Sequence, residues 1–159
     1  MYLSRFLVLT IFALMLYGVK ADDMVPSPLA IDQSMIGGKG LAPFAPWPKS
    51  MVLSGGDDKQ QLSEVFNGEF VTGIYQTKAT KLAITSPWPF DEYLFILSGE
   101  LHLTDASGKT QVFPTGSHLV VPRGFTGTWE MQGEMYRELY IIEAKAYAKS
   151  QEPGGLMAE

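Results

Sequence analysis

The chain has 159 residues, of which 46% are hydrophobic and 18% charged, with 12 Lys and Arg against 17 Asp and Glu. This length predicts one domain with a buried core, and the composition excludes a mostly disordered chain. The net charge of −5 argues against nucleic acid as a partner, because phosphate binding depends on Lys and Arg. The lack of cysteine excludes disulfides, thiolate metal sites and a cysteine nucleophile.

Residues 1–21 have the pattern of a secretory signal peptide. Arg5 precedes an apolar stretch from Phe6 to Tyr17, and Val19 and Ala21 occupy the −3 and −1 positions of a cleavage site. The apolar stretch is too short to cross a bilayer core of about 30 Å as a helix. We therefore predict a periplasmic or secreted protein that has no stable membrane insertion after cleavage. An uncleaved membrane anchor is the alternative.

Residues 22–50 are rich in Pro, Gly and small side chains. Pro43, Pro46 and Pro48 surround Trp47. Prolines at this density restrict the backbone and remove amide donors, which predicts an extended N-terminal arm.

Residues 51–143 form the predicted folded body. Short runs of Thr, Val, Ile, Tyr and Phe are separated by Gly, Pro, Asp and Ser, as in strands joined by turns. This pattern predicts an all-β, antiparallel sandwich or barrel, followed by a C-terminal tail at 144–159 with a short turn of helix at 144–149. The candidate strands are residues 51–54, 62–67, 69–77, 80–86, 92–97, 100–104, 110–113, 118–122, 127–131 and 136–142.

Two spaced motifs occur in the body. In the first, six residues separate Glu92 from Gly99, and in the second, five residues separate Gly116 from the triplet Pro122-Arg123-Gly124. The pair resembles the motifs of the cupins, which are small β-barrels of jelly-roll type. The stretches DEYLFILSGELHLTDASGKT and VVPRGFTGTWE also resemble the cupin subfamily named for (S)-ureidoglycine aminohydrolase. The resemblance implies a single cupin barrel behind the Pro-rich arm.

The resemblance also implies a metal site, which this sequence does not complete. Typical metal cupins bind Mn, Fe, Ni or Zn through three His and one Glu, and Glu92 is the one ligand that remains here. We therefore expect no cofactor; the alternative is a divalent transition metal such as Mn held by Glu92, His118 and a distant group. The motif spacing places the missing histidines at Thr85 or Ser86, at Pro87 or Trp88, and at Gly127.

Strand alternation predicts an aromatic and apolar pocket around Glu92. Glu92 shares its parity with Leu94 and Ile96, and Gly127 shares its parity with Trp129, so both sets are expected to face inward. Burial would raise the pKa of Glu92 and make it the candidate catalytic acid or base, with a hydrogen-bonded structural acid as the alternative. The candidate ligand-binding residues are Tyr75, Trp88, Glu92, Tyr93, His118, Arg123 and Trp129.

Three classes of function remain open at this point. The first is an exported binding protein whose barrel holds a small polar metabolite without a metal. The second is an enzyme, either metal-free through Glu92, or an aminohydrolase-like or other metal-dependent cupin with unusual ligands. The third is a non-catalytic interaction protein that forms a homodimer. We favour the binding protein, because the missing metal ligands weaken the case for an enzyme. We also expect this binding protein to form a homodimer.

Overall fold

A computed structural model describes residues 27–56 and 60–155 of the chain. The predicted signal peptide at 1–21 lies outside the described residues and stays a prediction. Neither helix in the described ranges has the length and apolar character needed to cross a bilayer.

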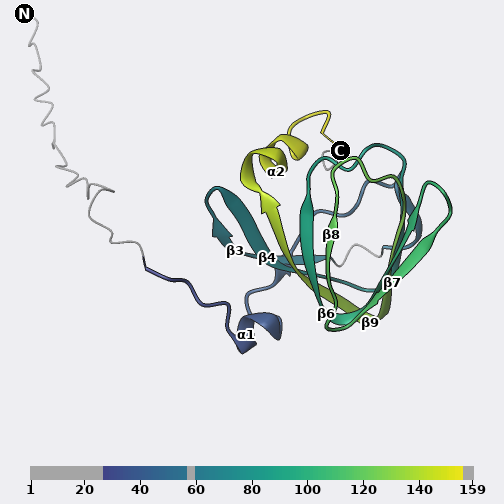
Figure 1. Ribbon diagram of the computed structural model, residues 1–159. Helices are drawn as coiled ribbons and strands as arrows, with labels where there is room; N and C mark the ends of the chain where they lie inside the picture. The colour runs from purple at the N-terminus through teal and green to yellow at the C-terminus, as the bar shows by residue number, and fades with distance from the viewer. Residues whose placement is uncertain (1–26, 57–59, 156–159) are drawn as a thin grey trace, which may run out of the picture.

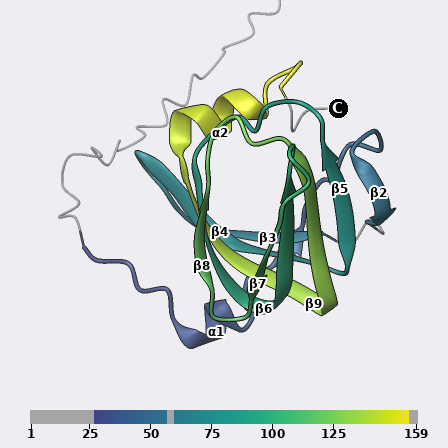
Figure 2. The ribbon, with the colours of Figure 1, turned by 45° about the vertical axis from the view of Figure 1, so that its right-hand side comes forward.

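The described strands are antiparallel and form one sheet that curls into a barrel (Figures 1 and 2). This confirms the all-β, jelly-roll-type barrel that the short strands predicted. The strands are β1 (Ala42–Pro43), β2 (Val52–Gly55), β3 (Gln61–Asn67), β4 (Phe70–Thr77), β5 (Thr80–Ile84), β6 (Glu92–Asp105), β7 (Thr110–Pro114), β8 (His118–Val121) and β9 (Gly127–Glu143), with helices α1 (Gln33–Ile36) and α2 (Ala144–Ser150).

Strands β6 and β9 run through the whole barrel and pair with each other along their length. On its other edge, β6 pairs first with β8 and then with β7. The first half of β9 pairs with β5, and its second half pairs with β4. Each of the two long strands therefore joins both halves of the barrel.

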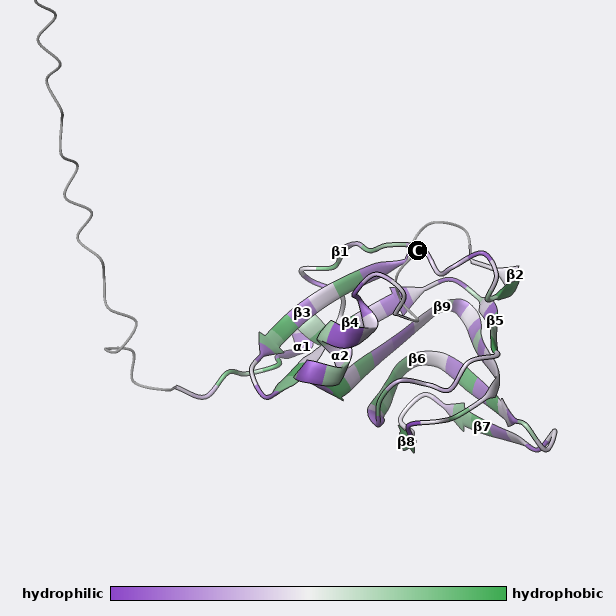
Figure 3. Ribbon diagram, turned by 90° about the horizontal axis from the view of Figure 1, so that it is seen from above, coloured by the Kyte–Doolittle hydropathy of each residue, from purple (hydrophilic) through white to green (hydrophobic). Residues whose placement is uncertain are grey.

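A break in register near the middle of β6 and β9 changes which residues face inward. The register of β6 against β9 shifts between Ile96 and Glu100, where Gly99 has a φ of +76°. A Cβ on Gly99 would overlap the carbonyl oxygen of Gln132 on β9, so this crossing requires glycine. Polar and apolar residues alternate along β6 after the break, from Glu100 to Thr104, whereas residues 93–97 before it are aromatic or aliphatic. Figure 3 shows the strands coloured by hydropathy. The buried residues of the two strands are Glu92, Leu94, Ile96, Leu101 and Leu103 on β6, and Trp129, Met131, Tyr136, Glu138, Tyr140 and Ile142 on β9.

This break corrects the predicted strand boundaries. The expected strands 92–97 and 100–104 are one strand, and so are 127–131 and 136–142. The glycines at the breaks resemble turn residues in the sequence, whereas here the chain continues through a bulge.

The N-terminal arm packs on the barrel of its own chain. It contains the short helix α1, which the sequence did not predict, and its Ala42 and Pro43 pair with Leu62 and Gln61 of β3. The amide of Phe44 then donates a hydrogen bond of 2.9 Å to the carbonyl of Gln60. The arm therefore adds a short edge strand to the sheet beside β3. Helix α2, the short helix expected after the last strand, begins beyond the capping side chain of Glu143 and packs on β4 and β9.

Candidate functional site

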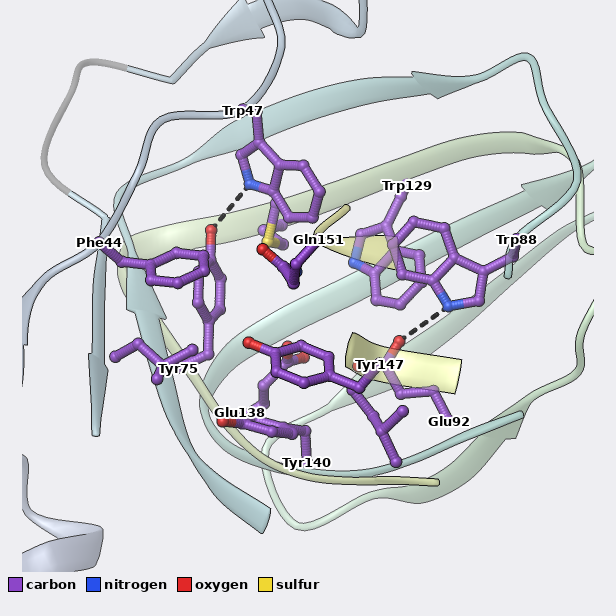
Figure 4. Close-up of a pocket in the computed structure, with 13 residues that line it drawn as sticks. Phe44, Trp47, Tyr75, Trp88, Glu92, Trp129, Glu138, Tyr140, Tyr147 and Gln151 are labelled. Carbon is purple, nitrogen blue, oxygen red and sulfur yellow. Dashed lines mark hydrogen bonds between the residues drawn. The ribbon is translucent and has the colours of Figure 1, made fainter. Parts of the chain in front are cut away.

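A cavity of about 60 Å³ lies between the inner face of the sheet, the arm and α2 (Figure 4). Most of the residues around it are aromatic or aliphatic, and two are buried acids. The lining residues are Phe44, Trp47, Leu62, Tyr75, Trp88, Glu92, Trp129, Met131, Glu138, Tyr140, Ile142, Tyr147 and Gln151.

All three tryptophans of the chain line this cavity. Trp47 belongs to the arm, Trp88 to the loop before β6, and Trp129 to β9. The ring centroid of Trp88 lies 6.4 Å from that of Trp47 and 5.1 Å from that of Trp129. The three indoles therefore form a continuous aromatic wall. The sequence predicted the inward position of Trp129 from its parity, but it did not predict that Trp47 joins the wall.

The turn of the second motif positions Trp88. The amide of Trp88 donates to the carbonyl of Phe125 at 3.0 Å, and its carbonyl accepts from the amide of Gly124 at 2.8 Å. Two backbone hydrogen bonds thus fix the loop that carries this indole above the first residue of β6.

Tyr75 anchors the arm over the cavity. The indole nitrogen of Trp47 donates to the hydroxyl of Tyr75 at 2.9 Å, and this hydroxyl donates to Oε1 of Gln60 at 3.0 Å. Burial raises the pKa of Tyr75, so it stays a neutral hydroxyl that can both accept and donate. Tyr75 lies at the cavity as expected, but its hydroxyl is already used to hold the arm.

Glu92 enters the cavity from the start of β6, and 6% of its surface is exposed. The indole nitrogen of Trp88 donates to its Oε2 atom at 3.0 Å. Burial raises the pKa of Glu92 well above its usual value, the nearby charge of Glu138 adds to this effect, and the hydrogen bond from Trp88 opposes it. Strand alternation predicted this inward position, and the burial that it implies predicted the raised pKa.

Glu138 is the second buried acid, and the sequence analysis did not identify it. It lies on β9 between Tyr75 of β4 and Ile96 of β6, and 5% of its surface is exposed. The hydroxyl of Tyr136 donates a hydrogen bond to its Oε2 atom. Burial raises the pKa of Glu138 to about 7, against the lowering effect of this hydrogen bond. A signal was present in the sequence, because Glu138 alternates with Tyr136 and Tyr140 in the same inward-facing set.

Tyr140 brings a further polar group to this region. Its side chain is 3% exposed and lines the cavity, and its hydroxyl has no hydrogen-bond partner within the described ranges. The hydroxyl lies over Gly73 of β4, where any Cβ would crowd it. Buried hydroxyls are rarely left without a partner, so this atom is a candidate to bind a water or a ligand in the cavity.

Tyr93 and His118 do not line the cavity, which corrects their expected position beside Glu92. Their side chains lie on the outer face of the barrel, where the hydroxyl of Tyr93 and Nδ1 of His118 are 2.6 Å apart. The ring of His118 also stacks on Phe95, with centroids 4.3 Å apart. The reason is strand parity: residues next to the inward-facing Glu92 and Leu119 must point outward.

Arg123 is also placed away from the cavity. Its side chain is exposed beside Lys145 and Lys149 in a separate surface hollow, and its amide donates to Oδ1 of Asp91 at 2.9 Å. The expected ligand-binding group is therefore a turn residue whose backbone holds the loop before β6.

The residues at the metal-ligand positions do not suit a transition metal. Thr85 and Ser86 are exposed, and the indole nitrogen of Trp88 is a hydrogen-bond donor that cannot coordinate a cation. Gly127 has a φ of +143°, and a Cβ there would overlap the carbonyl of Thr104, so no imidazole fits on this backbone. The described residues contain no group of three or more His, Cys, Asp or Glu side chains that could hold a metal ion.

Comparison with known proteins identifies the family. The model of the EutQ-like cupin domain matches residues 64–147, which is just over half of the chain. The chain belongs to this cupin family. The match does not confirm the ureidoglycine aminohydrolase type, which was the narrower resemblance. No curated protein sequence matches this cupin.

Three solved structures are among those similar to this chain. A protein of unknown function from Pseudomonas syringae pv. tomato has a TM-score of 0.58 at 20% identity, over 64% of this chain and 43% of its own. The putative ethanolamine utilization protein EutQ from Salmonella typhimurium has a TM-score of 0.46 at 20% identity, over 54% of this chain and 70% of its own. A cupin superfamily protein from Desulfitobacterium hafniense has a TM-score of 0.46 at 13% identity, over 57% of this chain and 83% of its own. This cupin thus spans less than half of the Pseudomonas protein, and the likeness concerns the fold alone.

Proposed function

We propose that this cupin is an exported protein that binds a small polar metabolite inside its barrel without a resident metal. The observation that carries the proposal is the cavity at which Glu92 and Glu138 are buried beside an aromatic wall. Cavities that combine apolar walls with a few convergent polar groups are typical of small-molecule sites.

The chemistry of the donor set supports a site without a resident metal. Trp88 supplies a proton donor to Glu92 at the position where the family pattern would have a metal ligand. One indole hydrogen bond thus satisfies one oxygen of Glu92. A metal-binding side chain at Gly127 would require the backbone of Thr104 to move.

Elemental analysis and ligand screening test this proposal together. The protein, purified without chelator, should contain Mn, Fe, Ni and Zn only at background level, and thermal-shift screening of small polar molecules should find ligands that raise the Tm. Near-stoichiometric metal that is lost in Glu92→Gln would overturn the metal-free site. A screen without any saturable ligand would overturn the binding function.

An enzyme is the alternative that one observation favours. Two buried acids with interacting charges can hold and release a proton near neutral pH, which is what general acid–base catalysis requires. Incubation of each screened ligand with the protein, followed by mass spectrometry, separates the two cases. Chemical change that Glu92→Gln abolishes would establish Glu92 as a catalytic residue.

Export and dimer formation complete the proposal. Export rests on the pattern of residues 1–21, and N-terminal sequencing of the mature protein should begin at Asp22.

The homodimer rests on the family resemblance alone, and light scattering after gel filtration should give twice the mature mass. The third class of function, an interaction protein, predicts the same dimer without a ligand in the barrel.

A further inference from the structure

We propose that the ligand is a small organic cation, an amine whose ammonium group lies between Glu92 and Glu138. This inference rests on the proposed binding function and adds the charge and size of the molecule that the cavity accepts.

Any charge that the ionisable side chains at the cavity can carry is negative, because they are acids and tyrosines. Glu92 and Glu138 are both buried, and none of the residues described as lining the cavity is Lys, Arg or His. A carboxylate removed from water needs a compensating charge or hydrogen bonds, and within the described residues each of these two acids receives one donor, from Trp88 and from Tyr136. Without a ligand the acids are compensated by holding protons, since burial raises the pKa of both. A bound cation would stabilise their ionised forms and release those protons, whereas an anion would be repelled by the ionised forms.

The aromatic wall favours the same class of ligand. The indole nitrogens of Trp47 and Trp88 already donate to Tyr75 and Glu92, so these two rings offer a ligand their carbon surfaces rather than their N–H groups. The π-surface of tryptophan attracts cations more strongly than that of other aromatic side chains.

Tyr140 is an independent sign of a bound molecule. Its hydroxyl is buried at the cavity, and the described part of the chain contains no partner for it. A neighbouring N–H or hydroxyl group on a ligand, or a water held by that ligand, would satisfy this atom.

The volume limits the size of the ligand. Because each water-sized group needs at least about 10–15 Å³, a cavity of about 60 Å³ holds about four to six such groups. A short alkylamine or a methylated ammonium ion fits this space as a whole, whereas a nucleotide or a sugar would extend beyond it.

Tryptophan fluorescence can test the charge preference directly, because all three tryptophans line the cavity. The purified protein would be titrated with propylammonium, tetramethylammonium, 1-propanol and propionate at constant ionic strength in sodium chloride. 1-Propanol has the shape of propylammonium without its charge, and propionate carries the opposite charge. At least one cation should give a saturable change, with affinity at least about tenfold above that of 1-propanol, and propionate should give none.

Matched variants locate the effect. Glu138→Gln and Glu92→Gln keep the size of each side chain and should each weaken cation binding at least about tenfold. Glu134→Gln, an exposed change on the same strand as Glu138, should leave binding unchanged. Near-ultraviolet circular dichroism checks folding, and the comparison of the four probes on the unaltered protein stands even if a variant fails to fold.

The outcomes distinguish the inference from the proposed function. Equal binding of propylammonium and 1-propanol, or tighter binding of propionate, would overturn the cation and leave a binding protein with a different ligand. Saturable binding of other polar molecules with no response to either cation would do the same. No response to these probes or to any molecule of the wider screen would overturn both.

Discussion

The indole nitrogen of Trp88 donates a hydrogen bond of 3.0 Å to Oε2 of Glu92, and both side chains are buried in the barrel. In the cupin pattern the position of Trp88 can belong to a metal ligand. Here the side chain donates a hydrogen bond to the carboxyl group, and an indole N–H cannot coordinate a cation. This bond gives the buried Glu92 a polar partner at a cavity whose described lining has no basic residue.

Loss of the Trp88 indole nitrogen, which donates to Glu92, should destabilise the protein more than the same Trp-to-Phe change at Trp129. Trp88→Phe leaves Glu92 buried without its hydrogen bond, whereas Trp129→Phe, in the same wall, removes no bond to a carboxylate. We expect Trp88→Phe to cost about 1–3 kcal/mol more than Trp129→Phe in urea unfolding followed by far-ultraviolet circular dichroism. Equal losses for the two variants would mean that the bond to Glu92 contributes nothing measurable.

Stability should fall as the pH rises from 5 to 8. Burial raises the pKa of Glu138 to about 7 and that of Glu92 well above its usual value, so the folded state holds protons that the unfolded state has released above pH 4.5. Unfolding therefore becomes easier with rising pH across this window, by on the order of 3 kcal/mol for a shift of this size at Glu138. Urea unfolding at several pH values measures the slope.

Glu138→Gln should flatten this slope, while Glu134→Gln should keep it. The exposed or nearly exposed acids with lowered pKa values, Asp32, Asp105 and Glu130, lose their contribution only below this window and do not interfere. Stability that rises between pH 5 and pH 8 would contradict the assignment of a buried, protonated pair.

The hydroxyl of Tyr75 should hold the arm on the barrel. Tyr75→Phe deprives Trp47 of its acceptor and the buried Gln60 of its donor, at a cost of about 1–3 kcal/mol. Faster amide exchange at 42–48 is expected in hydrogen–deuterium exchange. Tyr93→Phe, which removes an outer-face hydroxyl, is the control. If amide exchange at 42–48 is equally slow in Tyr75→Phe and Tyr93→Phe, the hydroxyl of Tyr75 does not anchor the arm.

Gly127 should tolerate no side chain. Its backbone has positive φ and approaches Thr104 too closely for a Cβ, so Gly127→Ala combines conformational strain with a steric overlap. We expect a loss of at least about 3 kcal/mol in thermal unfolding. Gly124 also has positive φ but has open space around its Cβ position, so Gly124→Ala should cost only about 1–2 kcal/mol. A stable Gly127→Ala protein would reopen this position to a metal-binding side chain.

The sequence by itself determined the parts of this protein that depend on local pattern. Alternation along residues 92–96 and 127–131 predicted that Glu92 and Trp129 face inward, and the motif spacing predicted a cupin barrel. These inferences succeeded because the side chains of a strand alternate with a period of two, whichever strand lies beside it.

The tertiary structure alone decided which of these groups meet. Glu138 reaches the same cavity as Glu92 because β9 pairs with β6 and the breaks in register reverse the parity of both strands. Trp47 joins the wall because the arm, 28 residues before Tyr75, folds back across the barrel. Such contacts depend on pairing between distant segments, and a period-two pattern read in one segment carries no information about its partner. For the same reason, strand parity was sufficient to predict that Tyr93 and His118 point outward. The position of the cavity could not be predicted from parity.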